Sequence, residues 1–228
     1  MTAAEGPTRH FHQELDALRS LLLEMSGLAE DQVAGAHEAM LGSDAARAAE
    51  VIELDLRVDE LELQIDKAAH ELLALQQPMA GDLRLITMTM RISNDLERVG
   101  DHAVNVAREV RRSGALLSFA RTPEVAEMAR IGRRMLSSVL DSFVRSDAVK
   151  AREVIEADAQ VDRLYNSVFR ILLTHMMEDP RWIGPAMSLL LISRNLERIG
   201  DLATNIAEDV VFMVEGVDIR HPSNPEER

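Results

Sequence analysis

One stretch of this sequence occurs twice, and the duplication decides how the chain is organised. Residues 43–61 read SDAARAAEVIELDLRVDEL, and residues 146–164 read SDAVKAREVIEADAQVDRL. A second stretch is doubled as well, since residues 96–101 read LERVGD and residues 196–201 read LERIGD. Copies this far apart indicate duplicated domains, because the units of a solenoid are shorter. The chain is therefore predicted to contain two related units.

The segments around these copies have the composition of a helical protein. Among 228 residues there are 11 glycines and 7 prolines, and aromatic residues make up 3%. Good helix formers such as Ala, Leu, Glu and Arg are abundant. The predicted fold is all-α, with two tandem pseudo-symmetric three-helix bundles at residues 1–121 and 122–228. Breakers and caps divide these bundles into six long helices, expected at 9–41, 45–76, 79–113, 123–145, 148–178 and 181–216.

Charge and cysteine content exclude several function classes. The formal net charge is −14 and lysine occurs only at Lys67 and Lys150, so binding to nucleic acid or to an anionic membrane is not expected. There is no cysteine, which excludes disulfides, Cys-based zinc sites and thiol catalysis. No secretory signal and no apolar run of about 18–20 residues is present, so we expect a cytoplasmic protein.

The doubled positions are mostly carboxylates spaced by four residues, which places them on one face of a helix. Asp55 and Asp59 share a face of the second expected helix, and on the third a row runs through Glu97, Asp101, Asn105 and Glu109. The second copy repeats these polar positions as Asp158, Asp162, Glu197, Asp201 and Asn205. If the two helices pack antiparallel, their rows face one another, and like charges repel unless a cation lies between them.

Oxygen ligands without Cys or His suit hard cations such as Mg²⁺, Ca²⁺, Mn²⁺ and ferric iron. His102 is matched by Leu202 in the second copy, so it lies outside the duplicated set. No Glu-x-x-His motif occurs, which disfavours a di-iron oxidase bundle. The alternative for both rows is a solvated helix face, which also carries acids at helical spacing.

A glycine and an arginine also occur at matching positions of the two repeats, inside the expected third and sixth helices. Gly100 and Gly200 each cost about 1 kcal/mol relative to Ala, which indicates close packing or room for a ligand. Arg98 and Arg198 are interpreted as salt-bridge partners of the acidic rows, with anion binding as the alternative. The sequence contains no Gly-rich phosphate loop, no Gly-x-Ser-x-Gly elbow and no His-Glu-x-x-His, so no catalytic motif is identified.

The doubled Leu-Glu-Arg-(Val/Ile)-Gly-Asp motif, each copy preceded by an Asp-x-x-Val-Asp helix, resembles the PhoU family of phosphate-signalling regulators. The resemblance covers residues 10–216 and implies two three-helix bundles whose (Glu/Asp)-x-x-x-Asp pairs bind metal ions or small metal clusters. Carried over to this sequence, one metal site comprises Asp55, Asp59, Glu97 and Asp101, and the other Asp158, Asp162, Glu197 and Asp201. Asn105 and Asn205 complete each site. The metal is left open among Fe, Mn, Mg and Zn.

The resemblance also implies a function without catalysis. Family members are negative regulators of the phosphate-starvation response and of phosphate uptake, which couple the phosphate ABC transporter and its ATPase to a sensor histidine kinase. They are cytoplasmic and reach the membrane only through these protein partners. A homodimer is left open. The alternative function is a metal-storage or metal-dependent hydrolytic helical bundle.

Overall fold

A computed structural model describes residues 7–113 and 122–220, and almost all of them are helical. No strand occurs in these two ranges, which agrees with the predicted all-α class. Six long helices follow one another as α1 (Pro7–Gly42), α2 (Ala45–Gln76), α3 (Ala80–Ser113), α4 (Pro123–Arg145), α5 (Ala148–Glu178) and α6 (Ile183–Glu215). The expected sixth helix begins differently, because a short 3₁₀ turn, η2 (Pro180–Trp182), precedes α6.

The doubled Ser-Asp pair makes the same helix-to-helix turn in both repeats. Ser43 and Ser146 both have φ of 52°, in the left-handed region that ends a helix. The next residue then caps the following helix: the Asp44 carboxylate accepts hydrogen bonds from the backbone N–H groups of Ala46 and Arg47, and Asp147 does the same at the start of α5. A turn this short forces the two helices that it joins to run antiparallel.

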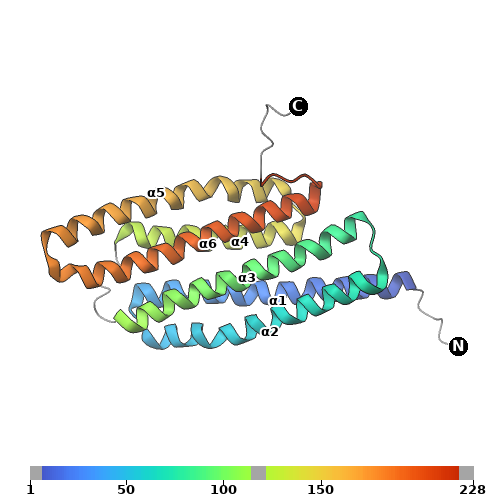
Figure 1. The fold of residues 1–228 in the computed structure, drawn as a ribbon, viewed down its shortest axis with the longest axis horizontal. Coiled ribbons are helices and arrows are strands. Elements are labelled where there is room, and N and C mark those ends of the chain that lie inside the picture. The colour runs from blue at the N-terminus through green and yellow to red at the C-terminus, as the bar shows by residue number, and fades with distance from the viewer. Residues whose placement is uncertain (1–6, 114–121, 221–228) are drawn as a thin grey trace, which may run out of the picture.

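The six helices form two three-helix bundles that lie side by side (Figure 1). Helices α1, α2 and α3 pack on one another in the first bundle, and α4, α5 and α6 do so in the second. The two bundles meet mainly along α3 and α6, with a smaller contact between α1 and α4. The buried apolar side chains of all six helices form one continuous core, so the repeats are two halves of a single packed body.

We expected the boundary between the two repeats after residue 121. Residues 114–121 lie outside the described ranges, so this boundary stays a prediction. Within the described ranges, no helix combines the length and the apolar character needed to span a membrane.

Candidate metal centres

In the second repeat, three carboxylates from two helices come together at the surface. One oxygen each from Asp158 and Asp162 on α5 and from Asp201 on α6 lies within 4.8 Å of the other two. Hard cations bind oxygens at about 2.1–2.6 Å, so ligands on opposite sides of one ion are about 4–5 Å apart. The spacing of this triad therefore fits a single cation of the kind that the carboxylate chemistry favours.

Asp158 is the most constrained member of the triad. Its Oδ1 is buried and has no hydrogen-bond partner among the described residues. Burial, and then the charges of Asp162 and Asp201, raise the pKa of Asp158 to about 6. Burial and the same two acids also raise the pKa of Glu197. A cation between these groups would offset both the desolvation and the repulsion.

Arg198 supplies positive charge at the rim of the triad. Its Nη1 lies 2.7 Å from Asp201 Oδ2, and its Nε lies 3.4 Å from a Glu197 carboxylate oxygen. The expected salt bridge to the acidic row is thus confirmed for Arg198. Arg98, its counterpart, pairs instead with Asp95 on its own helix, at 3.2 Å.

In the first repeat the matching acids gather more loosely. Burial, and then the charges of Asp101 and other nearby acids, raise the pKa of Glu97 to about 7. Burial also raises the pKa of Asp55, to which Asp59 and Asp101 add repulsion. The four acids therefore lie within electrostatic reach of one another. Within the described part of the chain, however, no three carboxylates of this repeat approach as closely as the second-repeat triad.

The first cluster has an additional polar contact, which comes from α1. Gln32 is fully buried, and its Nε2 donates a hydrogen bond to Asp55 Oδ1 at 3.1 Å. Sequence reasoning did not identify this residue as part of the site. The available signal was a glutamine on the apolar face of α1, between the buried Ala29 and Val33, where a polar side chain requires a polar partner.

The two asparagines are placed differently. Asn205 lines a hollow of about 350 Å³ together with Asp158 and Asp201, next to the second triad. Asn105 is exposed, and its Oδ1 accepts a hydrogen bond from Arg108 at 3.3 Å. Asn205 is exposed as well, so the two asparagines differ in their neighbours and not in their burial.

One sequence interpretation is corrected where α3 packs on α6, and one further residue gains a neighbour there. Glu109 does not continue the acidic row, because it is buried and accepts hydrogen bonds from Arg112 and Ser113. His102, which lies outside the duplicated set, lines the hollow beside Asp158 and Asp201, and its Nδ1 lies 2.9 Å from Asn195 Oδ1 on α6. A side chain of the first repeat thus borders a hollow that two acids of the second repeat also line, which the spacing within one repeat cannot reveal.

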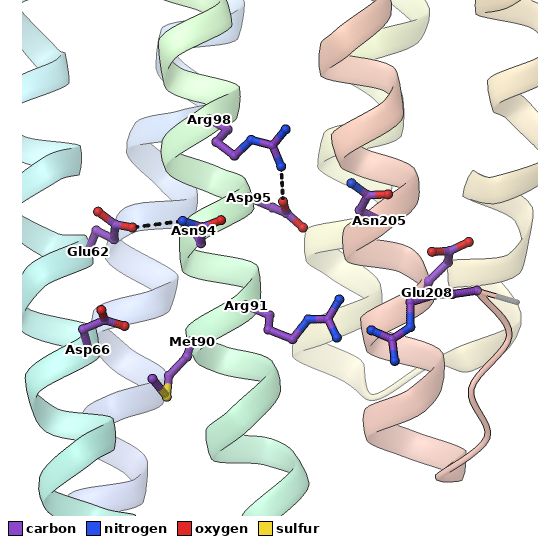
Figure 2. A pocket seen from close by; sticks show the side chains of 10 residues that line it. Glu62, Asp66, Met90, Arg91, Asn94, Asp95, Arg98, Asn205 and Glu208 are labelled. Atoms are coloured by element: carbon purple, nitrogen blue, oxygen red, sulfur yellow. Dashed lines mark hydrogen bonds and ion pairs between the residues drawn. The ribbon is translucent and has the colours of Figure 1, made fainter.

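A larger hollow, of about 480 Å³, extends between α3 and α6 and reaches α2 (Figure 2). Its arginines are engaged by acids: Arg98 pairs with Asp95, and Arg91 Nε lies 3.1 Å from the buried Asp209. Glu62, which continues the acidic face of α2, accepts a hydrogen bond from Asn94 here at 3.4 Å. The charged side chains around this hollow therefore form ion pairs, and the pair between Arg91 on α3 and Asp209 on α6 joins the two repeats.

Both repeats of the chain are similar in sequence to one family of known proteins. The PhoU domain family matches residues 22–110 and 125–210, once in each repeat. The chain is 41% identical over 206 residues to the "Phosphate-specific transport system accessory protein PhoU homolog" of Zymomonas mobilis, covering 90% of this chain and 87% of the relative. Identity to the protein of the same name from Pseudomonas aeruginosa is 42% over 218 residues, covering 94% of this chain and 89% of the relative.

Two solved structures share the fold over almost the whole chain. The crystal structure of PhoU from Pseudomonas aeruginosa superposes with a TM-score of 0.85 at 41% identity, covering 91% of this chain and 100% of the other. The phosphate transport system regulatory protein PhoU from Streptococcus pneumoniae gives a TM-score of 0.82 at 27% identity, covering 92% and 100%.

Proposed function

Because the chain belongs to the PhoU family, we propose that it is a negative regulator of the phosphate-starvation response and of phosphate uptake. The observation that carries this proposal is the match along both repeats to relatives named as phosphate-specific transport system accessory proteins. The chain covers most of each relative, so the likeness concerns whole proteins of the same architecture. The role is regulatory and requires no catalytic residues.

The partners in this proposal are the ATPase of the phosphate ABC transporter and a sensor histidine kinase. The transporter is supported by the names of the relatives. The kinase is the output through which a regulator of this kind alters gene expression. The protein would act in the cytoplasm and reach the membrane through these partners, which is compatible with its lack of basic patches and its net charge of −14.

The metal part of the proposal assigns one cation site to each repeat. The proposed ligands are Asp55, Asp59, Glu97, Asp101 and Asn105 in the first repeat, and Asp158, Asp162, Glu197, Asp201 and Asn205 in the second. The triad spacing and the unpartnered Asp158 Oδ1 support the second site. Raised pKa values at Glu97 and Asp55 support the first, because they report crowded, partly desolvated acids. A bound cation would neutralise these acids and stabilise the pairing of α2 with α3 and of α5 with α6.

Deleting the gene in its native host tests the regulatory role. In plentiful phosphate, the deletion strain should produce alkaline phosphatase at the level of phosphate-starved cells, because nothing restrains the kinase. A plasmid copy of the wild-type chain should restore repression. Normal repression in the deletion strain would contradict the proposal and favour the metal-storage or metal-dependent hydrolytic alternative.

Metal removal tests the sites themselves. Adding Mn²⁺ to chelator-treated protein should raise its melting temperature, since a cation at roughly a hundred times its Kd contributes about 2.7 kcal/mol of stability. At saturating Mn²⁺, Asp101→Ala and Asp201→Ala should each remove about half of the bound metal measured by elemental analysis, because each variant disrupts one of two separate sites. Glu156→Ala is the matched control, because this exposed carboxylate on α5 points away from Asp158. A melting temperature that does not change on adding Mn²⁺ would show that these acids only form solvated helix faces and bind no metal.

A further inference from the structure

The buried amide of Gln32 lies between the core and the first cluster of acids. Its side chain is 0% exposed, Nε2 donates to Asp55 Oδ1, and Oε1 is buried without a hydrogen-bond partner among the described residues. Oε1 lies against Gly100 on α3, where a Cβ atom on this glycine would be only 2.6 Å away. The amide is therefore wedged between two helices, and its donor end is directed at a proposed metal ligand.

The second repeat has no such amide. Gln32 precedes Ser43 by the same number of residues as Met135 precedes Ser146, and these serines occupy the same turn in both repeats. Met135 is buried and offers no N–H donor. Beside Gly200, the polar atom nearest to an added Cβ is Asp158 Oδ1 itself, at 3.4 Å. Thus a carboxylate oxygen lies next to the glycine in the second repeat, where the first repeat has an amide.

We infer that Gln32 makes the two cation sites unequal, so that the second site binds a hard divalent cation more tightly than the first. The inference rests on the proposed metal sites. Gln32 acts as a positioning residue, because its hydrogen bond holds Asp55 Oδ1 on the α1 side of the cluster. A cation that uses this oxygen shares it with the Gln32 amide, which leaves one lone pair fewer and less negative charge for the metal, whereas Asp158 Oδ1 has no competing donor among the described residues.

Arg198 is the competing group at the second site, and its geometry explains why it competes less. The Arg198 side chain is 45% exposed and holds Asp201 through Oδ2. A solvent-exposed arginine that loses its carboxylate partner can hydrogen-bond to water, so little free energy is lost. A buried amide that loses its partner is left with an unsatisfied N–H group, which costs more. Arg198 can therefore yield to a cation more readily than Gln32 can.

Calorimetric titration of the chelator-treated full chain with Mn²⁺ tests the inference. Wild-type protein should show a tight site that Asp201→Ala abolishes and a weaker site that Asp101→Ala abolishes. Gln32→Met, which copies the second repeat at similar side-chain volume, should tighten the weaker site by about tenfold, the effect of one hydrogen bond to a charged group. Met135→Gln, the reciprocal exchange, should weaken the tight site. Gln32→Leu offers a second variant of similar size that has no donor at all, and it too should tighten the weaker site.

The outcomes separate this inference from the proposal on which it rests. Equal affinities in the wild-type protein, or affinities unchanged by Gln32→Met and Gln32→Leu in variants with wild-type circular dichroism, overturn the role of Gln32 and leave the metal sites standing. An absence of Mn²⁺ binding in wild-type protein overturns the metal sites, and this inference with them. Neither result affects the deletion test of the regulatory role.

Discussion

Gly100→Ala should lower the free energy of unfolding by up to about 2 kcal/mol, while the same substitution at Gly200 should leave it unchanged or raise it by up to about 1 kcal/mol. A Cβ on Gly100 would lie 2.6 Å from Gln32 Oε1, inside a packed core. Overpacking of a core costs about 1–3 kcal/mol, and the better helix propensity of alanine returns about 1 kcal/mol. At Gly200 the nearest atom would be 3.4 Å away, an ordinary contact, so the gain in propensity dominates.

Urea unfolding of both variants checks this expectation, and a double-mutant cycle with Gln32→Ala identifies the cause. Removing the Gln32 amide should relieve the clash, so the cost of Gly100→Ala should disappear in the Gln32→Ala background. Equal effects at Gly100 and Gly200, or a cost that persists without the amide, would contradict the assignment of Gly100 to close packing. The comparison is well matched, because the two glycines occupy the same position of the doubled motif.

The second large effect concerns Asp209, a carboxylate at 0% exposure where α6 packs on α3. Burial raises the pKa of Asp209 to about 6; Arg91 and Arg220 oppose the shift, and Asp95 and Glu208 add to it. Because the folded pKa lies above the unfolded one, the native state holds a proton that the unfolded chain releases between about pH 4 and pH 6. The stability from this proton is fully present below about pH 4 and is lost as the pH rises through about 6.

Asp209→Asn removes this dependence. The unfolding free energy of wild-type protein relative to Asp209→Asn should fall by about 2.5 kcal/mol between pH 4 and pH 7, because a tenfold difference in proton affinity between the folded and unfolded states corresponds to about 1.4 kcal/mol. Urea unfolding at a series of pH values, with a chelator present, measures this difference in unfolding free energy. Asp31→Asn, which removes one exposed carboxylate, is the control for a change of net charge. A difference between wild type and Asp209→Asn that stays constant with pH would show that this carboxylate titrates alike in both states.

Local sequence signals predicted the helices well, because each boundary is made by residues close in the chain. The Ser-Asp pairs end one helix and cap the next through hydrogen bonds to residues two and three positions ahead. Gly216, the expected exit of the last helix, ends α6 at φ of 72°. The start of α6 was less well predicted, because Pro180 follows the Asp179 cap and opens a 3₁₀ turn before α6.

The candidate site was predicted in part. Spacing by four residues identified Asp158, Asp162 and Asp201, and the structure brings these three together. Spacing could not show that Gln32 on α1 donates a hydrogen bond to Asp55 on α2. The periodicity within one helix does not tell which residues of a second helix lie opposite it. The row through Glu109 failed because this carboxylate is buried, and Ser113, which donates to it, also contacts Ser188 on α6 at 2.8 Å.

The sequence by itself determined the helices, their duplication and the acidic faces, because caps, propensity and periodicity act between residues within a few positions of one another. Only the tertiary structure decided that the two acidic clusters are unequal and that the repeats share one core. Gln32, Gly100 and His102 acquire their roles from helices that meet side by side, and the distances between helices depend on how the whole core packs. A duplicated sequence therefore predicts two similar acidic clusters, whereas the buried residues at the matching positions of α1 and α4, Gln32 and Met135, differ in chemistry.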